Sequence, residues 1–201
     1  KLLKHRGIEA KDGIKNVSVL HLVGRETRAK APTPIQKFTI YFSSLSPYAA
    51  ADILGLNEAQ FGRFFKAYDA AKLILKDVGE FPKKGEEEKA IQLDEFETGW
   101  PKLTLSMLID VAGMILDKMN NKPLNPFNSI FKSNMDKVGI RINAVDTNSE
   151  LSWGALLSKL WQLSRTKVFD NPSAQPILFT ELIKPGRVTI IDLSDSDSTI
   201  V

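Results

Sequence analysis

The 201-residue chain contains no cysteine and only two histidines, His5 and His21. The lack of cysteine excludes disulfide bonds, thiol nucleophiles and Cys-ligated zinc or iron–sulfur sites. Two histidines leave little material for an imidazole metal site, so we expect no metal-binding residues. No apolar run approaches the roughly 18–20 residues that span a bilayer, and no signal peptide opens the chain. We therefore expect no membrane partner, and the absence of cysteine fits a cytoplasmic location.

The sequence also lacks a phosphate-binding loop of the form G-x-x-x-x-G-K-[ST]. The nearest match is residues 79–86, where the spacing is wrong, a proline interrupts the loop and a run of glutamates follows. Such loops hold phosphate with backbone N–H groups and a lysine, and neighbouring carboxylates would repel it. We interpret this segment as a solvated loop.

Charge is distributed unevenly along the chain. The formal net charge is +3, but residues 1–40 carry +6 whereas residues 41–100 carry −4. Arg25, Arg28 and Lys30 lie in the basic region, just after the first expected strand. They are our candidate nucleic-acid-binding residues, because their side chains could contact DNA phosphates. Alternatively, one of the arginines could act in trans at a subunit interface. A solvated loop with no ligand is the third interpretation.

Three segments predict β-strands. Residues 17–23 are almost continuously apolar, which is typical of a strand buried on both faces of a parallel sheet. His21 within this strand is interpreted as a core histidine. Residues 37–42 alternate between apolar and polar. Residues 188–193 follow a Pro-Gly pair that fits a type II turn, and their nearly uninterrupted apolar run predicts a strand in the interior of the sheet.

The stretch between the second and third strands is mainly helical in pattern. Capping residues and apolar spacing predict helices at residues 47–54, 58–78, 104–119 and 150–164. Residues 79–102 and 120–134 are expected to be connectors, residues 138–142 a short strand, and residues 177–183 a short helix. A gap this long between strands predicts an α/β fold in which a large helical insertion interrupts the sheet.

Asp192 ends the third expected strand. A strand followed by Asp is similar to the Walker B segment, whose carboxylate helps to hold Mg²⁺. A second acid normally follows, whereas Leu193 stands here. We therefore favour an ordinary strand-end Asp, or an Asp that helps to cap a following helix.

Several segments, taken in order, resemble the central ATPase domain of HerA-like proteins, in the HerA/FtsK group of P-loop motors. They are residues 38–46 with 54–60, residues 153–163 with 168–170, and residues 182–194. The resemblance covers roughly residues 35–200, and its last segment, "KPGRVTIIDLS", is the most specific. It implies a partial RecA-like sheet with residues 1–45 as core strands, residues 46–170 as the helical insertion and residues 171–201 as the return to the sheet.

The resemblance also implies a function for the parent protein. HerA-like proteins are ATP-driven DNA translocases or helicases, usually hexameric rings, and often work with a nuclease in DNA-end processing or defence. The parent would bind ATP and Mg²⁺, but the Walker A loop is expected before Lys1 and the Walker B Asp-Glu pair after Val201. We therefore expect no catalytic or cofactor-binding residue in this chain, and Asp192 would lie in the strand before Walker B.

The two ends lead to a related expectation. The chain starts with Lys1 rather than Met, and it stops at a Ser/Asp cluster that is typical of a helix start. We expect a piece of a larger protein. The alternative of a different class is a stand-alone helical protein-interaction or DNA-binding module with no nucleotide role.

Overall fold

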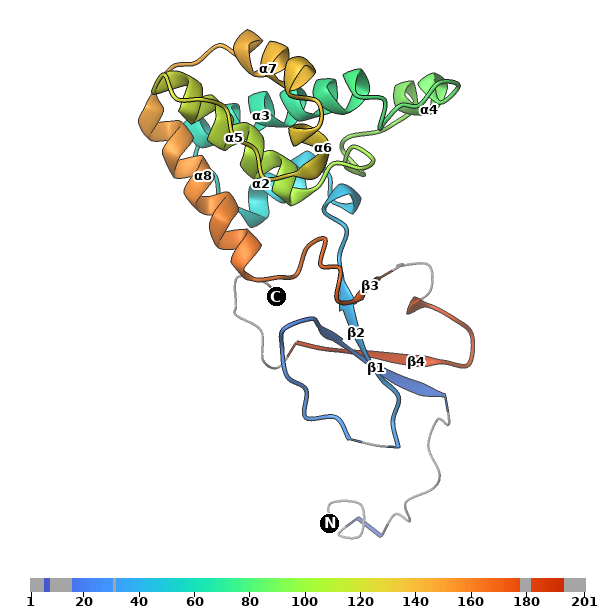
Figure 1. The fold of residues 1–201 in the computed structure, drawn as a ribbon. Helices are drawn as coiled ribbons and strands as arrows, with labels where there is room; N and C mark the ends of the chain where they lie inside the picture. The colour runs from blue at the N-terminus through green and yellow to red at the C-terminus, as the bar shows by residue number, and fades with distance from the viewer. Residues whose placement is uncertain (1–5, 8–15, 31, 178–181, 194–201) are drawn as a thin grey trace.

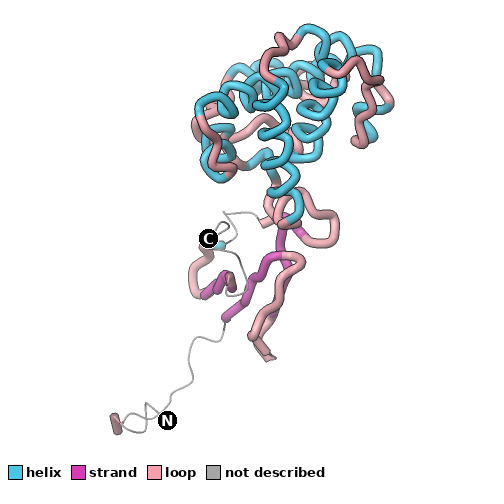
Figure 2. The backbone as a smooth tube through the Cα atoms, turned by 90° about the vertical axis from the view of Figure 1, so that its left-hand side faces the viewer, coloured by secondary structure: helices cyan, strands magenta, loops and turns pink. Residues whose placement is uncertain are grey.

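The computed structural model describes residues 6–7, 16–30, 32–177 and 182–193. Helices gather at one end of the molecule and strands at the other, as two perpendicular views agree (Figures 1 and 2). The strands are β1 (Val17–Leu22), β2 (Ile35–Thr39), β3 (Gln175–Pro176) and β4 (Val188–Asp192). All of them are parallel and their order is β3-β2-β1-β4. The expected helix-rich α/β class is therefore confirmed.

The sheet has β1 at its centre. Residues 18–22 are all buried, as the apolar run predicted, and His21 is 5% exposed. β4 departs from the prediction of an interior strand, because among the described residues it pairs only with β1. Two consecutive residues of β4, Ile190 and Ile191, point to opposite faces of the sheet. Their side chains remain 47% and 43% exposed. Apolar β-branched residues favour a strand whether or not it is buried, so the apolar run predicted a strand here but not its position in the sheet.

Helices α2–α8 all lie between β2 and β3 in sequence. Their bounds are α2 (Pro47–Ile53), α3 (Glu58–Asp77), α4 (Glu87–Ile91), α5 (Leu105–Met119), α6 (Ser129–Lys132), α7 (Met135–Ala144) and α8 (Glu150–Arg165). The four helices expected at residues 47–54, 58–78, 104–119 and 150–164 are present as α2, α3, α5 and α8. The expected connectors carry the short helices α4 and α6. Most of the helix expected at residues 177–183 lies outside the described residues.

Three of the four expected helices start with a side-chain capping hydrogen bond. Ser46 Oγ accepts from the N–H of Ala49, and Thr104 Oγ1 accepts from the N–H of Met107. Asn57 and Gln60 form a reciprocal capping box at α3. Ser149 precedes α8 as predicted, but its backbone is left-handed and its side chain makes no capping bond.

The strand predicted at residues 138–142 is wrong, because this segment belongs to α7. Val138 and Ile142 are fully buried whereas Ile140 is 67% exposed. Residues four apart share one face of a helix, and the residue between them lies on the opposite side. Three apolar residues at alternate positions therefore fit both structures, and packing of α7 against α3 and α5 selects the helix.

An ion pair ties α7 to the end of α3. Arg141 Nε donates to Asp77 Oδ2 at 2.6 Å and Arg141 Nη2 donates to Asp77 Oδ1 at 2.9 Å. These hydrogen bonds hold the pKa of Asp77 below its ordinary value. A lowered carboxyl pKa stabilises the fold above the unfolded-state pKa, and this stability is lost as pH falls through the folded-state pKa.

We therefore expect a double-mutant cycle with Asp77→Asn and Arg141→Gln to give a favourable coupling free energy at pH 7. Urea unfolding measures it. The coupling should shrink as the pH falls below about 4, the ordinary pKa of Asp. The Lys66–Asp146 pair, 3.3 Å apart and more exposed, is the control and should couple more weakly. Equal coupling for both pairs, or coupling at Asp77 that survives full protonation, would contradict this account.

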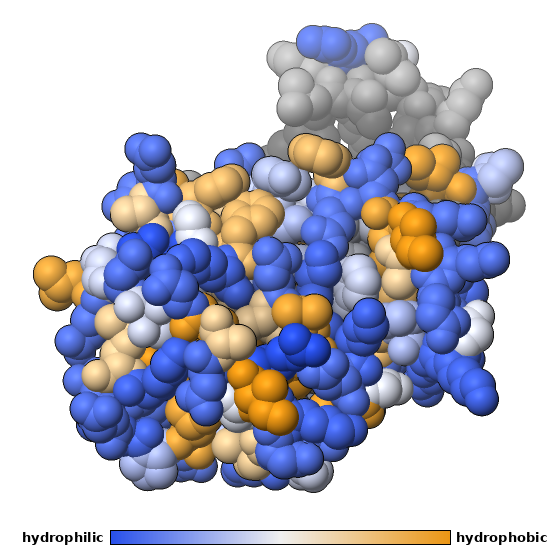
Figure 3. All heavy atoms as spheres, turned by 90° about the horizontal axis from the view of Figure 1, so that it is seen from above, coloured by the Kyte–Doolittle hydropathy of each residue, from blue (hydrophilic) through white to orange (hydrophobic). Residues whose placement is uncertain are grey.

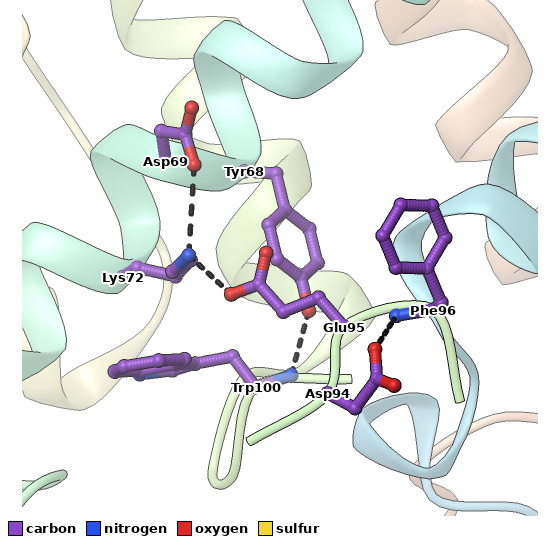
Figure 4. Close-up of polar contacts among 7 residues, drawn as sticks. All are labelled: Tyr68, Asp69, Lys72, Asp94, Glu95, Phe96 and Trp100. Atoms are coloured by element: carbon purple, nitrogen blue, oxygen red, sulfur yellow. Dashed lines mark hydrogen bonds and ion pairs between the residues drawn. The ribbon is translucent and has the colours of Figure 1, made fainter. Parts of the chain in front are cut away.

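Residues 92–100 lie against α3 through polar and aromatic contacts (Figure 4). Lys72 forms ion pairs with Glu95 and Asp69, and its Nζ lies 4.7 Å from the centre of the Trp100 ring. The N–H of Trp100 donates to the Tyr68 hydroxyl at 2.6 Å, and burial raises the pKa of Tyr68. These contacts fix the segment that enters α5.

Viewed from the helical end, the surface is mostly hydrophilic, with apolar residues in several separate patches (Figure 3). Within the described ranges, no helix combines the length and the apolar character needed to cross a bilayer.

Candidate nucleic-acid interface

The carboxyl ends of the four strands meet at one edge of the sheet, because all four strands run in the same direction. In open α/β sheets this edge is the usual place for a ligand. The segment after β1, residues 24–30, lies there and carries the predicted Arg25, Arg28 and Lys30; we call it the basic loop. Arg28 and Lys30 are exposed and Arg25 is half-buried.

The basic loop is held by hydrogen bonds at its start. Gly24 has a φ of +78°, which turns the chain at the end of the strand. The N–H of Arg25 donates to the Leu22 carbonyl at 3.1 Å, and His21 Nδ1 lies 3.1 Å from the Arg25 carbonyl. The buried histidine thus supports the loop, which agrees with the interpretation of His21 as a core residue.

Asp192 lies beside the same loop. Its Oδ2 accepts a hydrogen bond from the Thr27 hydroxyl, and Thr27 Oγ1 also accepts from the N–H of Ala29. This contact fits a carboxylate that positions the loop. Within the described residues, no three His, Asp or Glu side chains come together as a possible metal site.

Sequence reasoning missed one cation at this edge. Lys167 is exposed and lies against Gly24, with its Cδ 3.9 Å from the position that a Cβ would occupy on that glycine. Lys167 is more than 130 residues away along the chain, and no periodicity or motif connects it with the basic loop.

Lys167 begins a segment, residues 167–171, that we call the strap. The strap extends the sheet beyond β2: the N–H of Ile40 donates to the Val168 carbonyl at 3.0 Å, and the N–H of Asp170 donates to the Ile40 carbonyl at 2.9 Å. The second strand was predicted at residues 37–42, but β2 ends earlier, at Thr39. It cannot extend to residue 42 because Phe42 starts the 3₁₀ turn η1 (Phe42–Ser44). The strap is where the chain passes from α8 back to the sheet (Figure 1).

Asp170 joins the sheet to the helices. Its Oδ1 accepts from the N–H of Phe42 and its Oδ2 from the N–H of Leu105, both at 3.0 Å. Burial raises the pKa of Asp170 above its ordinary value. Both oxygens are engaged by the backbone, so this carboxylate holds the start of α5 against η1.

The segment at residues 79–86 is a loop, as predicted, but only part of it is solvated, because Phe81 is buried against the Trp100 ring. Lys83 and Lys84 are exposed, and Glu86 accepts a hydrogen bond from the N–H of Lys83 rather than leaving that N–H for a phosphate.

Comparisons with known proteins leave the family undetermined: no protein-family model, curated protein or solved structure matches the chain.

Proposed function

We propose that this chain is the central part of a HerA-like, ATP-driven DNA translocase or helicase and is not itself competent to hydrolyse ATP. The observation that carries the proposal is the pairing of β4 with β1, in parallel, across a long helical excursion between β2 and β3. This is the arrangement that the resemblance implies. The three resembling segments fall on the end of β2 with η1 and the start of α3, on α8 with the strap, and on β4.

In this proposal the chain supplies the sheet and presents the basic loop to DNA. ATP and Mg²⁺ are bound by other parts of the parent protein, which is cytoplasmic, assembles as a hexameric ring and works with a nuclease. The proposal is tested on the polypeptide encoded by the whole gene. DNA-stimulated ATP hydrolysis is the expected result, and no ATP hydrolysis with or without DNA would overturn it.

The isolated chain offers a second test, at the basic loop. Replacing Arg25, Arg28 and Lys30 together with Ala should weaken binding to a duplex at least tenfold at low salt. Each phosphate contact contributes about 0.9 to the slope of log K against log [salt], so the slope should flatten by about 2–3. Fluorescence anisotropy over a salt series measures both quantities.

The matched control replaces three exposed lysines of the helical end, Lys76, Lys122 and Lys132, with Ala. It removes the same charge but leaves the sheet edge unchanged, so it should retain most of the binding. Equal losses in both triple variants would assign binding to net charge, and unchanged binding in the loop variant would reject the loop as the DNA contact.

A further inference from the structure

A cleft of about 640 Å³ lies where the carboxyl ends of β2 and β3 meet the start of α5. Its volume falls within the roughly 300–1,000 Å³ typical of small-ligand sites. The residues that matter for its chemistry are Tyr41, Ser43, Lys102, Thr104, Asp170 and Asn171. We call it the junction cleft.

The lining combines an exposed aromatic ring with a cation. Tyr41 is 50% exposed although it lies between the buried Thr39 and Phe42. Lys102 is exposed, and it is the cationic residue of the described lining. The acidic residue of the lining, Asp170, is already engaged by two backbone N–H groups. The junction cleft is therefore suited to a ligand that has a flat ring and a negative charge.

Two residues of the lining adopt the left-handed backbone region, Lys102 with φ +68° and Asp170 with φ +51°. Residues other than glycine rarely adopt this region, and such positions concentrate at binding and catalytic sites. The turn that carries Lys102 is closed by the N–H of Leu103, which donates to the Trp100 carbonyl at 3.1 Å. Lys102 is thus held at the rim by the same segment that is fixed to α3 in Figure 4.

The strap connects the basic loop with the junction cleft along the chain. Lys167 lies against Gly24 at one end of the strap, while Asp170 and Asn171 line the cleft at the other. The five residues of the strap therefore separate the cation beside the loop from the cleft.

We propose that the junction cleft binds one nucleotide unit of single-stranded DNA, with the base on the Tyr41 ring and the phosphate beside Lys102. Base stacking on an aromatic side chain with nearby positive charge is the usual way to hold single strands without sequence preference. The inference rests on the proposed DNA function and specifies the form of its substrate.

The test uses the full chain with (dT)15, dTMP and a duplex as probes. Tyr41→Ala should weaken (dT)15 binding at least about fivefold, and Tyr41→Phe, which keeps the ring, should retain it. Lys102→Asn removes the charge while keeping a residue that tolerates the left-handed backbone. It should weaken (dT)15 binding and reduce the salt slope by about 0.7. Lys122→Asn, just beyond the C-terminal end of α5, is the matched control and should bind as the wild type does.

The duplex separates this inference from the proposed function. Tyr41→Ala should leave duplex binding unchanged, whereas the basic-loop triple variant should lose it. If dTMP competes with (dT)15, a free nucleotide is sufficient for binding to the cleft. If it does not compete, the cleft binds a nucleotide only as part of a strand. Both results support the cleft as a nucleotide site. Wild-type chain that binds neither (dT)15 nor dTMP, or (dT)15 binding unchanged by both Tyr41→Ala and Lys102→Asn, would overturn it.

Discussion

Gly99→Ala is expected to lower the free energy of unfolding by about 2–3 kcal/mol, the upper part of the range for overpacking a buried site. A Cβ on Gly99 would lie 2.3 Å from the Leu45 carbonyl oxygen and 2.9 Å from that of Ser43. Both atoms belong to the backbone, so no side-chain rotation relieves the clash. Residues 99–100 would have to move away from η1, and the hydrogen bond from the Trp100 N–H to Tyr68 would be disturbed.

Urea unfolding measures the loss, and Gly62→Ala is the control. Gly62 lies within α3 with nothing within 4 Å of an added Cβ. Alanine is a better helix former than glycine, so this variant should be more stable than the wild type by about 0.5–1 kcal/mol. Opposite signs for the two substitutions are the expected result. A Gly99→Ala protein as stable as the wild type would show that the approach of residue 99 to η1 is not tight.

The sequence was sufficient to locate the elements whose signals are local. α3 and α5 each combine a capping residue with an apolar stripe, and both formed within a residue or two of the predicted bounds. The central strand β1 was recognisable because seven consecutive residues are mostly apolar. The loop cations Arg25, Arg28 and Lys30 were placed correctly after this strand, since position next to a strand end is itself a local property.

What the sequence could not supply depends on contacts between distant residues. Alternating apolar residues in α7 fitted a strand until packing on α3 distinguished the two faces. Lys167 lies against the basic loop, and Lys102 lines the same cleft as Tyr41, only because the strap and the start of α5 return to the carboxyl edge. Gly99 carries no local signal either, because its requirement comes from a backbone more than 50 residues away.

Asp170→Ala is expected to have the other large effect, a loss of about 2–4 kcal/mol in the free energy of unfolding. It would leave the N–H groups of Phe42 and Leu105 without their acceptor, and each buried unsatisfied donor costs about 1–3 kcal/mol. Asp170→Asn tolerates the left-handed backbone and keeps one acceptor oxygen, so it should lose about half as much. Asp94→Ala is the control, because its carboxylate accepts from the N–H of Phe96 at an exposed site and should cost under about 1 kcal/mol.

The difference in stability between the wild type and Asp170→Asn, measured as a function of pH, then tests whether burial raises the pKa of Asp170. Burial favours the protonated acid, so the folded-state pKa exceeds the unfolded-state value. Such a shift stabilises the fold fully below the unfolded-state pKa, and this contribution is lost as pH rises through the folded-state pKa. The stability of the wild type relative to Asp170→Asn should therefore grow as the pH is lowered from 7 to about 4, the ordinary pKa of Asp. Asp69, Asp77 and Asp110 titrate in both proteins and largely cancel in this difference. If the advantage of the wild type shrinks instead, the two backbone N–H groups stabilise the carboxylate more than burial penalises it, and the direction given for the pKa is wrong.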